Sequence, residues 1–332
     1  MKKVCIVGYG AIGPVHAKAL EHVKSASLYA VCDILDERRK ACSEQYDVVE
    51  YDDFDDMLKD TCIDTVHICT PHYLHFEMMK KALAAGKHVV VEKPVTMTKN
   101  EFEELLTLDG IERVCVVLQN RYNPSIVKLK EIIASGELGK VRAAKAMLTW
   151  KRDKKYYESG AWRGKWDTEG GGVLINQAIH TLDYFSYLIG DVVSVKANMH
   201  NYSLENVIEV EDTFNACLKL KNDIKGIFFA TNAYEEISAP YFEILFEKGR
   251  ARYIDMQLWV NGKMVAEDSN PGIGKACWGS GHEILLRQYY DAHNYFKITD
   301  VENTMRTVFS MYESAKSGGR EVLHLQTYVQ QR

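Results

Sequence analysis

The 332-residue chain contains no block of basic residues, and its formal net charge is −5. This charge balance argues against nucleic acid and anionic membranes as main partners, because both attract strongly basic surfaces. The sequence also lacks an apolar run long enough to cross a bilayer, and no signal-peptide core follows Met1-Lys2-Lys3. We therefore expect a cytoplasmic protein that acts on a small molecule.

None of the eight cysteines forms a C-x-x-C pair. The sequence thus shows neither a disulfide framework nor a zinc motif, and we expect no metal. Most of the cysteines lie in apolar runs, as small core residues do in a reducing compartment. A G-x-S-x-G elbow is missing as well, so Ser-His-Asp hydrolysis has no support.

Apolar runs alternate with helical patterns over the first 120 residues. The runs are residues 3–7, 27–32, 64–69, 88–91 and 113–118. They are continuously apolar, which is typical of parallel strands covered by helices on both faces. The pattern predicts an α/β N-terminal domain, a doubly wound parallel sheet of the Rossmann type, over residues 1–120.

The pattern changes after residue 120, and a chain of this length is too long for one ordinary core. Strand-like runs joined by turns follow at residues 140–150, 192–200, 209–220, 224–231, 241–247 and 250–260. Two helices, at about 281–297 and 301–317, close the chain. We predict an α+β C-terminal domain with a mostly antiparallel sheet over residues 121–332.

A glycine-rich motif follows the first predicted strand and opens a helix: Gly8-Tyr9-Gly10-Ala11-Ile12-Gly13, or G-x-G-x-x-G. Its glycines allow a tight turn and close approach of a pyrophosphate, which the helix N-terminus attracts. Asp33 ends the second strand, where a carboxylate accepts hydrogen bonds from ribose hydroxyls and repels a 2′-phosphate. The motif predicts NAD in preference to NADP, although Arg38 and Arg39 follow closely and weaken that preference.

Polar residues also follow the third strand. We expect Thr70 and Pro71 to shape a loop beside the nicotinamide. His72 and His75 begin the next helix, without a carboxylate or cysteine at metal-ligand spacing. Hydrogen bonding to the cofactor is the preferred interpretation, and helix capping is the alternative.

Glu92-Lys93-Pro94 follows the fourth strand. Pro94 restricts Lys93 to extended backbone, which presents its amine at the carboxyl end of a parallel strand, where ligands bind. An amine placed there can exchange a proton with an alcohol. The alternative for such a short motif is a surface lysine that ends a strand.

The stretch from Thr168 to Phe185 combines three glycines with polar residues in an apolar run. Asn176, His180 and Asp183 fall on one face of a helix predicted over residues 173–188. A buried polar face costs free energy unless its groups are paired or used. A histidine with a carboxylate one turn away can act as acid or base on a hydroxyl. The alternative is a core histidine bonded to Asp183.

Taken together, GYGAIG, CTPHYLH, VEKP, QNRYNP, WRGKW and GGGVLINQAIHTLD resemble the Gfo/Idh/MocA family of NAD(P)-dependent oxidoreductases, in the right order along nearly the whole chain. The resemblance implies a Rossmann domain followed by a domain whose open sheet supports homodimers or homotetramers. It also implies a sugar, inositol or related polyol as substrate.

The resemblance further implies roles for particular residues. Catalysis falls to Lys93 and His180. The implied cofactor-binding residues are the six from Gly8 to Gly13, with Asp33, Cys69, Thr70, Pro71, His72, His75, Glu92, Lys93, Asn120, Arg121, Trp162 and Arg163. The implied substrate-binding residues are Lys93, Arg121, Tyr122, Tyr156, Arg163, Asn176, Gln177 and His180.

Two positions depart from the family pattern. Asn176 stands where many members have aspartate, and His72 stands where asparagine is usual. The N-Q before A-I-H looks like members that act on C3 of hexoses, including nucleotide-sugar 3-dehydrogenases. We therefore expect hydride transfer from C3 of a hexose, glycoside or nucleotide sugar, with Lys93 and His180 sharing the proton transfer.

Two other functions stay open at this point. A redox-neutral NAD-dependent glycosidase would work through a 3-keto intermediate and cleave glycosides without net NADH. A non-catalytic NAD(H)-binding sensor would bind the nucleotide and turn over no sugar.

Overall fold

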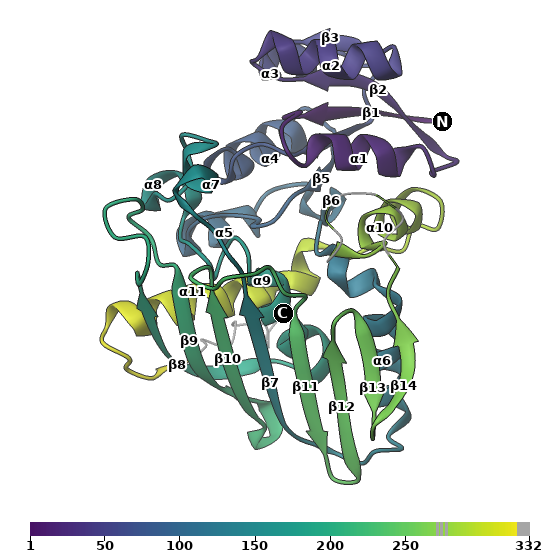
Figure 1. Cartoon of the computed structure of the whole chain (residues 1–332). Helices are drawn as coiled ribbons and strands as arrows, with labels where there is room; N and C mark the ends of the chain where they lie inside the picture. Colours follow the sequence, from purple (N-terminus) through teal and green to yellow (C-terminus); the bar gives the residue numbers. More distant parts are fainter. Residues whose placement is uncertain (270–271, 273–274, 276–277, 324–332) are drawn as a thin grey trace. The chain divides into compact units, whose positions relative to one another are not determined.

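A computed structural model describes residues 1–269, 272, 275 and 278–323 (Figure 1). The chain forms two compact units. The first unit contains Met1–Asn123 and Ser269–Val301, and the second contains Pro124–Asp268 and Glu302–Arg332. The chain therefore returns to the first unit after building most of the second, which the sequence pattern did not indicate.

The first unit is built on a six-stranded parallel sheet with the order β3-β2-β1-β4-β5-β6 (Figure 1). Its strands are β1 (Lys2–Val7), β2 (Ala26–Cys32), β3 (Val49–Tyr51), β4 (Thr65–Ile68), β5 (His88–Val91) and β6 (Val114–Val116). The order reverses between β1 and β4, and ligands bind at such a switch point in open α/β sheets. The predicted doubly wound α/β fold is confirmed.

Helices connect these strands. They are α1 (Gly13–Leu20), α2 (Asp36–Tyr46), α3 (Phe54–Leu58), α4 (His75–Ala84) and α5 (Lys99–Leu105), with short 3₁₀ turns η1 (His72–Leu74), η2 (Ile111–Arg113) and η3 (Gln119–Tyr122). Asp53 caps α3 by accepting a hydrogen bond from the Asp56 backbone N–H. Thr98 and Glu101 form a capping box at the start of α5. These local signals fix where the helices start.

Helix α10 (Gly281–Tyr290) and the turn η7 (Ile298–Val301) complete the first unit. Leu285, Leu286, Tyr289 and Tyr290 are buried in one core with residues of α1 and β1. The helix was predicted to reach residue 297 and ends at Tyr290. The next residue, Asp291, accepts hydrogen bonds from the backbone N–H and hydroxyl of Ser25, so the chain leaves the helix there.

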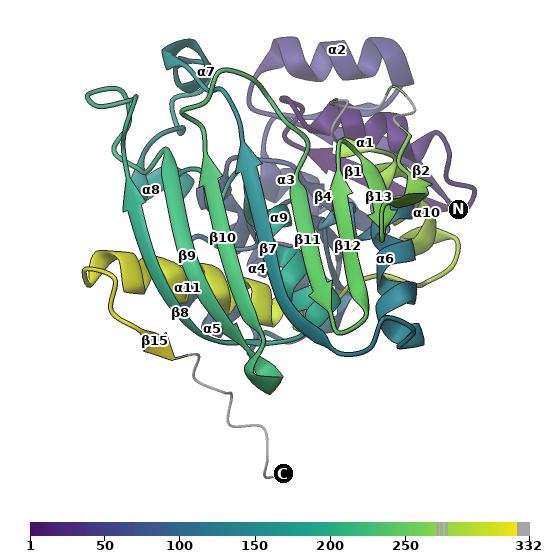
Figure 2. The same cartoon turned by 60° about the horizontal axis from the view of Figure 1, so that its bottom comes forward.

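The second unit is built on a nine-stranded sheet with the order β14-β13-β12-β11-β7-β10-β9-β8-β15 (Figure 2). Its strands are β7 (Val141–Thr149), β8 (Val192–His200), β9 (Thr213–Leu220), β10 (Lys225–Thr231), β11 (Tyr241–Phe246), β12 (Gly249–Ile254), β13 (Gln257–Val260), β14 (Lys263–Glu267) and β15 (Val322–Leu323). Neighbours are antiparallel except for the parallel pair β7 and β10. The predicted mostly antiparallel sheet is confirmed.

The second unit also contains helices, of which α6, α9 and α11 contact strands of this sheet, and α11 crosses behind β8 and β9 in Figure 2. They are α6 (Pro124–Ser135), α7 (Lys154–Glu158), α8 (Trp166–Glu169), α9 (Ile179–Tyr184) and α11 (Glu302–Lys316), with a π-helical turn η4 (Phe185–Ile189) and a 3₁₀ turn η5 (Lys221–Asp223). Within the described part of the chain, no helix combines the length and apolar content that a membrane crossing needs.

The predicted single strand over residues 250–260 is wrong, because the segment folds back on itself. Asp255 and Met256 have positive φ angles of 49° and 63° and form the turn between β12 and β13. Asn261 and Gly262 form the next turn, with φ angles of 49° and 84°. Asn-Gly is a strong signal for a two-residue hairpin, and it marks the start of β14.

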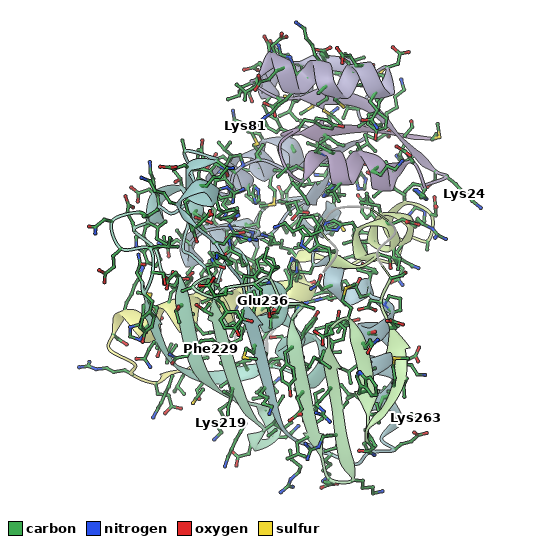
Figure 3. All side chains as sticks on the ribbon, in the orientation of Figure 1. Lys24, Lys81, Lys219, Phe229, Glu236 and Lys263 are labelled. Carbon is green, nitrogen blue, oxygen red and sulfur yellow. The ribbon has the colours of Figure 1, made fainter. Side chains whose placement is uncertain are left out.

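The second face of the nine-stranded sheet is exposed and carries apolar side chains. Met147, Ile227 and Leu245 are 43%, 59% and 45% exposed, whereas their neighbours along each strand are buried. Figure 3 shows Phe229 of β10 on the same sheet. Charged residues lie between them on the same face, including Lys145 opposite Ile227 and the ion pair of Lys145 with Glu243. The face thus combines exposed apolar side chains with charged ones.

Seven of the cysteines lie among the described residues, and all seven are free. Five of them are buried, namely Cys5, Cys32, Cys42, Cys69 and Cys115. They are core residues, as the sequence predicted.

Candidate active site

The glycine-rich loop is tight enough to require glycine. Gly8 has φ of +88°, and a Cβ there would lie 2.9 Å from the backbone C and O atoms of Cys69. A Cβ on Gly13 would lie 2.5 Å from the Gly8 carbonyl oxygen. The loop therefore joins the ends of β1 and β4 closely and leads directly into α1. No side chain caps the start of α1, and an uncapped helix N-terminus of this kind is suited to hold an anion.

Asp33 is buried directly beside this loop. Its Oδ2 accepts a hydrogen bond of 2.8 Å from the Tyr9 backbone N–H, and its Oδ1 accepts one of 3.0 Å from the Leu35 N–H. Arg38 lies 3.6 Å from Asp33 Oδ2, while Arg39 donates to the Asp33 carbonyl oxygen. The loop and the carboxylate together fit a dinucleotide whose ribose lies against Asp33.

His75 joins the loops that follow β4 and β5. Its Nδ1 lies 2.7 Å from the Pro94 carbonyl oxygen, and its Nε2 lies 2.9 Å from the Thr70 carbonyl oxygen. Burial lowers the pKa of His75, and the two carbonyl contacts oppose that shift. Because both ring nitrogens face the protein's own backbone, we assign His75 to holding the two loops together. His72 is buried with its ring centroid 5.9 Å from that of His75.

Lys93 is half-buried at the carboxyl end of β5, as the sequence predicted, and a cis peptide bond joins it to Pro94. Its backbone N–H donates to Glu92 Oε2 at 3.2 Å. The Glu92 carboxylate is buried and also lies 3.1 Å from His16 Nε2. The structure thus fixes the backbone on both sides of Lys93.

The turn η3 carries three further residues expected at the site. Both terminal nitrogens of Arg121 donate to the Asp300 carbonyl oxygen at 3.2 Å, and its guanidinium lies 4.6 Å from the centre of the Phe296 ring. Tyr122 meets the same ring edge-on at 5.3 Å, and Asn120 is buried beside them. These contacts hold residues 296–300, and the roles expected for Asn120, Arg121 and Tyr122 in ligand binding stay predictions.

In the second unit, the predicted helix over residues 173–188 begins only at Ile179. Residues 171–178 form turns, and Gly171 has φ of +153°. The cause is Glu211, whose carboxylate accepts hydrogen bonds from the backbone N–H groups of Gly172 and Leu174, at 3.0 and 3.1 Å. Asn176 and Gln177 therefore lie on the turns that lead into α9, and His180 is on its first turn.

Glu169 fixes the orientation of Asn176. It is completely buried, and it accepts hydrogen bonds from the Asn176 side-chain amide and the Gly164 backbone N–H. The amide NH₂ of Asn176 therefore points to Glu169. Nothing in the sequence singled out Glu169, because a glutamate before a glycine run is normally a solvated residue.

A hydrogen-bonded network connects the aromatic stretch to the segment before α9. The Tyr156 hydroxyl accepts hydrogen bonds from Arg163 and from the Gln177 amide. The Gln177 carbonyl oxygen in turn accepts one from Asn232 at 3.0 Å. The Arg163 guanidinium lies 4.5 Å from the Tyr156 ring centre and 4.6 Å from that of Trp162. The structure thus brings together most of the predicted substrate-binding residues of this unit.

His180 is 9% exposed, and Asp183 follows it one turn later. The Asp183 carboxylate accepts a 2.6 Å hydrogen bond from the Thr304 hydroxyl of α11. The Asp183 carboxylate therefore holds α9 against α11, whether or not it also orients the His180 ring.

Glu211 is a buried carboxylate that anchors the triple-glycine segment. It accepts hydrogen bonds from Gly172, Leu174 and the Tyr312 hydroxyl. Burial raises the pKa of Glu211 to about 7, even though these hydrogen bonds act to lower it. Sequence patterns do not single out Glu211, because it lies about 40 residues after the segment that it holds.

This raised pKa predicts a pH-dependent stability. Because the folded protein holds the Glu211 proton more tightly than the unfolded chain, stability falls as pH rises from about 4.5 to about 7. Relative to the Glu211→Gln variant, the wild-type free energy of unfolding should fall by about 3 kcal/mol between pH 5 and pH 8. Urea titrations of both proteins across this range measure the difference. The exposed Glu209→Gln variant should follow the wild type, and parallel curves for wild type and Glu211→Gln would contradict the assignment.

Comparisons with known proteins agree with this geometry. Residues 2–127 match the family model described as "Oxidoreductase family, NAD-binding Rossmann fold", and residues 126–252 match the model described as "GFO/IDH/MocA C-terminal domain". The first unit is therefore an NAD-binding Rossmann domain. The two models together span most of the chain.

Two curated relatives and one solved structure illustrate the similarity. An uncharacterised oxidoreductase of Synechocystis is 29% identical over 74% of this chain and 70% of its own. The D-glucoside 3-dehydrogenase of Escherichia coli is 30% identical over 60% of this chain, and the match covers only 57% of the relative. The WlbA dehydrogenase of Bordetella pertussis, solved with NADH and UDP-GlcNAcA, is 25% identical with a TM-score of 0.87 over 98% of both chains. The chain belongs to the Gfo/Idh/MocA family of oxidoreductases.

Proposed function

We propose that the protein is an NAD-dependent dehydrogenase that oxidises a secondary hydroxyl of a sugar or polyol, with C3 of a hexose, glycoside or nucleotide sugar as the first choice. The observation that carries this proposal is the placement of Lys93. Its backbone leaves β5 at the edge where the nucleotide loop lies, and Glu92 and the His75 bridge fix that backbone. An amine carried by this fixed backbone is suited to take the proton of a hydroxyl group.

The residues of the first unit supply the cofactor site in this proposal. The backbone from Gly8 to Gly13 and the start of α1 hold the pyrophosphate, and Asp33 holds the ribose. Bound NAD supplies the acceptor for the hydride that leaves the carbinol carbon. Lys93 stabilises the negative charge that develops on the hydroxyl oxygen, and Lys93 or His180 accepts the proton.

The residues of the second unit suit a polyhydroxylated ring. Amide, hydroxyl and guanidinium groups gather here at positions fixed by their own hydrogen bonds: Gln177 and Arg163 donate to the Tyr156 hydroxyl, and Asn176 donates to Glu169. Arg152 is buried against the rings of Trp150 and Tyr156. The two guanidinium groups of Arg152 and Arg163 favour a substrate with an acidic or phosphorylated portion. Of the similar proteins, WlbA was solved with such a molecule, the nucleotide sugar UDP-GlcNAcA, whereas the name of the Escherichia coli enzyme indicates a neutral glucoside.

The test mixes stoichiometric enzyme and NAD with hexoses, glycosides, inositols and nucleotide sugars. Reduced-nicotinamide absorbance and product mass are recorded together, since a tightly held cofactor would hide a single turnover in a dilute assay. NADH with a product two hydrogens lighter supports the dehydrogenase and identifies its substrate. Glycoside cleavage without lasting NADH would reassign the protein as a redox-neutral glycosidase. NAD binding with every sugar unchanged would remove the support for Lys93 and His180 as catalytic residues.

The position of Asp33 predicts the effect of changing it. The Asp33→Ser variant should bind NAD about 10- to 100-fold more weakly, because hydrogen bonds to a charged group contribute about 1.5–3 kcal/mol. The same variant should bind NADP more tightly, because Arg38, 3.6 Å from the lost carboxylate, is then free to meet the 2′-phosphate. Titrations of both cofactors by calorimetry measure this exchange. Asp36→Ser serves as control, and an unchanged ratio of the two affinities would remove Asp33 from the ribose site.

We also propose that the protein is a homo-oligomer that pairs through the exposed face of the nine-stranded sheet, where Met147, Ile227 and Leu245 lie among charged residues. The Ile227→Lys substitution places a charge at the centre of that face, next to Lys145 of the neighbouring strand, and should produce monomers. Tyr202→Lys, which changes an exposed residue in a loop, should leave the assembly intact. Light scattering after gel filtration distinguishes these outcomes. A wild-type monomer, or an Ile227→Lys oligomer of unchanged size, would contradict this interface.

A further inference from the structure

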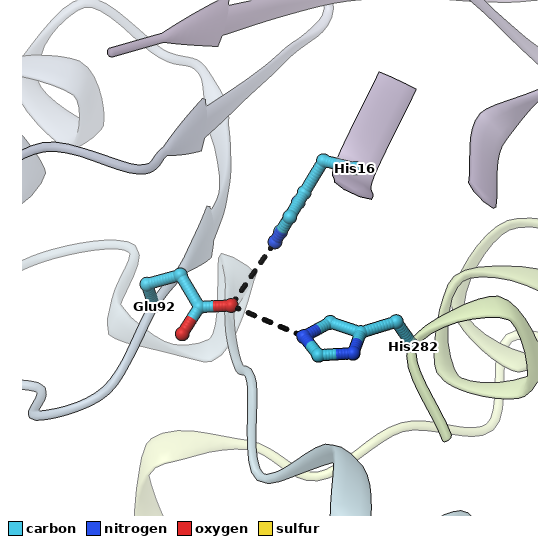
Figure 4. Close-up of side chains that lie close together, drawn as sticks. All are labelled: His16, Glu92 and His282. Atoms are coloured by element: carbon cyan, nitrogen blue, oxygen red, sulfur yellow. Dashed lines mark hydrogen bonds and ion pairs between the residues drawn. The ribbon is translucent and has the colours of Figure 1, made fainter. Parts of the chain in front are cut away.

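Two histidines and one glutamate meet in the interior of the first unit (Figure 4). His16 comes from α1, Glu92 from the end of β5, and His282 from the first turn of α10. They are 1%, 6% and 4% exposed. Glu92 Oε1 lies 3.1 Å from His16 Nε2 and 3.5 Å from His282 Nε2, and the three ligand-type atoms lie within 4.8 Å of one another.

We propose that His16, Glu92 and His282 bind a divalent transition-metal ion, with zinc as the first choice. Two imidazoles and one carboxylate are a donor set that zinc uses in proteins, with a small molecule such as water in the fourth position. Bonds of about 2.0–2.1 Å in a tetrahedral zinc site place neighbouring donor atoms about 3.3 Å apart. The observed separations of 3.1 and 3.5 Å fall on either side of this value.

The surrounding hydrogen bonds orient His16 as a ligand. Its Nδ1 lies 3.0 Å from His67 Nδ1, and His67 Nε2 lies 2.8 Å from the Tyr290 hydroxyl. An Nδ1–H on His16 that donates to His67 leaves the lone pair of His16 Nε2 directed at Glu92. Metal-bound histidines commonly donate their second N–H to such a partner, which fixes the ring and its tautomer.

A hydrogen bond without a metal explains only part of this arrangement. It joins His16 to Glu92. Among the described residues, buried His282 Nε2 has only the long 3.5 Å contact with the same carboxylate oxygen, drawn in Figure 4, which is not a normal hydrogen bond. A buried polar atom normally has a partner. A cation among the three residues contacts all of them and balances the buried carboxylate.

The three ligands come from parts of the chain that are far apart in sequence. A metal at this position ties α10 to α1 and to the loop that precedes Lys93. The ion has a structural role in this proposal and does not contact the substrate.

The test uses the full chain without an affinity tag, since a histidine tag binds metal itself. After gel filtration in chelator-free buffer, inductively coupled plasma mass spectrometry should measure about one zinc ion bound per chain. Protein stripped with a chelator and titrated with Co²⁺ should develop the visible absorption of four-coordinate cobalt at one equivalent. His282→Gln should lose both signals, whereas His200→Gln, at an exposed histidine of the second unit, should keep them.

Two outcomes would overturn the inference. One is folded wild-type protein, as judged by circular dichroism, that binds neither zinc nor cobalt at one equivalent. The other is His282→Gln with the same stoichiometric metal and the same cobalt spectrum as the wild type. If His282→Gln does not fold, the cobalt titration of the wild type decides the question alone.

Discussion

Replacing Lys93 with methionine is expected to lower kcat by about 10²- to 10⁴-fold, the usual range for losing a positioned acid or base. Methionine keeps the length and the apolar stem of the side chain but removes its charge and its exchangeable proton. The surrounding backbone should stay in place, because its contacts with Glu92 and His75 use main-chain atoms. Single-turnover rates with the substrate that the panel identifies measure the loss.

The Lys93→Arg variant separates two roles of this lysine. Arginine keeps a positive charge but does not deprotonate in proteins, so it stabilises an oxyanion without accepting a proton. A rate close to that of Lys93→Met indicates that Lys93 transfers the proton. A rate close to that of the wild type indicates an electrostatic role, with His180 as the base.

Two controls keep this result interpretable. Lys99→Met removes an exposed lysine a few residues later and should leave kcat unchanged. NAD binding by Lys93→Met should persist, since the loop from Gly8 to Gly13 and Asp33 carry most of the cofactor contacts in our proposal. Full activity in Lys93→Met would remove the lysine from the mechanism.

The sequence predicted those parts of the fold that depend on neighbours along the chain. The continuously apolar run of β1, the glycine loop after it and Asp33 at the end of β2 form one local unit, so their spacing already indicates a nucleotide site. Asn261-Gly262 is also a local turn signal, but the strand predicted over residues 250–260 does not take it into account. Helix α10 was expected, but its apolar face is equally compatible with either core, so its place in the first unit was not predictable.

The sequence could not predict the interior of the candidate site, because that interior is built from contacts between residues far apart in the chain. The helix pattern placed Asn176 and His180 on one continuous helix, but Glu211 captures two backbone N–H groups and delays the helix until Ile179. In a sequence, Glu169 and Glu211 resemble surface charges, because glutamate is almost never fully buried. His16, Glu92 and His282 also show no metal-binding spacing in the sequence, because they come from three separate segments of the chain.

Gly172→Ala is expected to destabilise the second unit by about 4 kcal/mol or more, which is exceptional for a single methyl group. A Cβ at Gly172 would lie 1.8 Å from the Glu211 carbonyl oxygen and 2.9 Å from its carbonyl carbon. These are backbone atoms, so the clash cannot be relieved by a side-chain rotation, and the hydrogen bonds from Gly172 and Leu174 to the Glu211 carboxylate would be lost together. Thermal unfolding should show a much lower Tm, or the variant should fail to accumulate as folded protein.

Gly136→Ala is the matched control for this prediction. Gly136 lies in the same unit with φ of +69°, and nothing lies within 4 Å of a Cβ built there. The alanine variant therefore carries only the strain of a left-handed backbone, about 1–2 kcal/mol. A Gly172→Ala protein as stable as Gly136→Ala would mean that the segment from Gly170 to Asn176 moves freely away from Glu211. In that case the carboxylate would not set the position of Asn176 and Gln177, and the start of α9 would owe its geometry to the Glu169 contact instead.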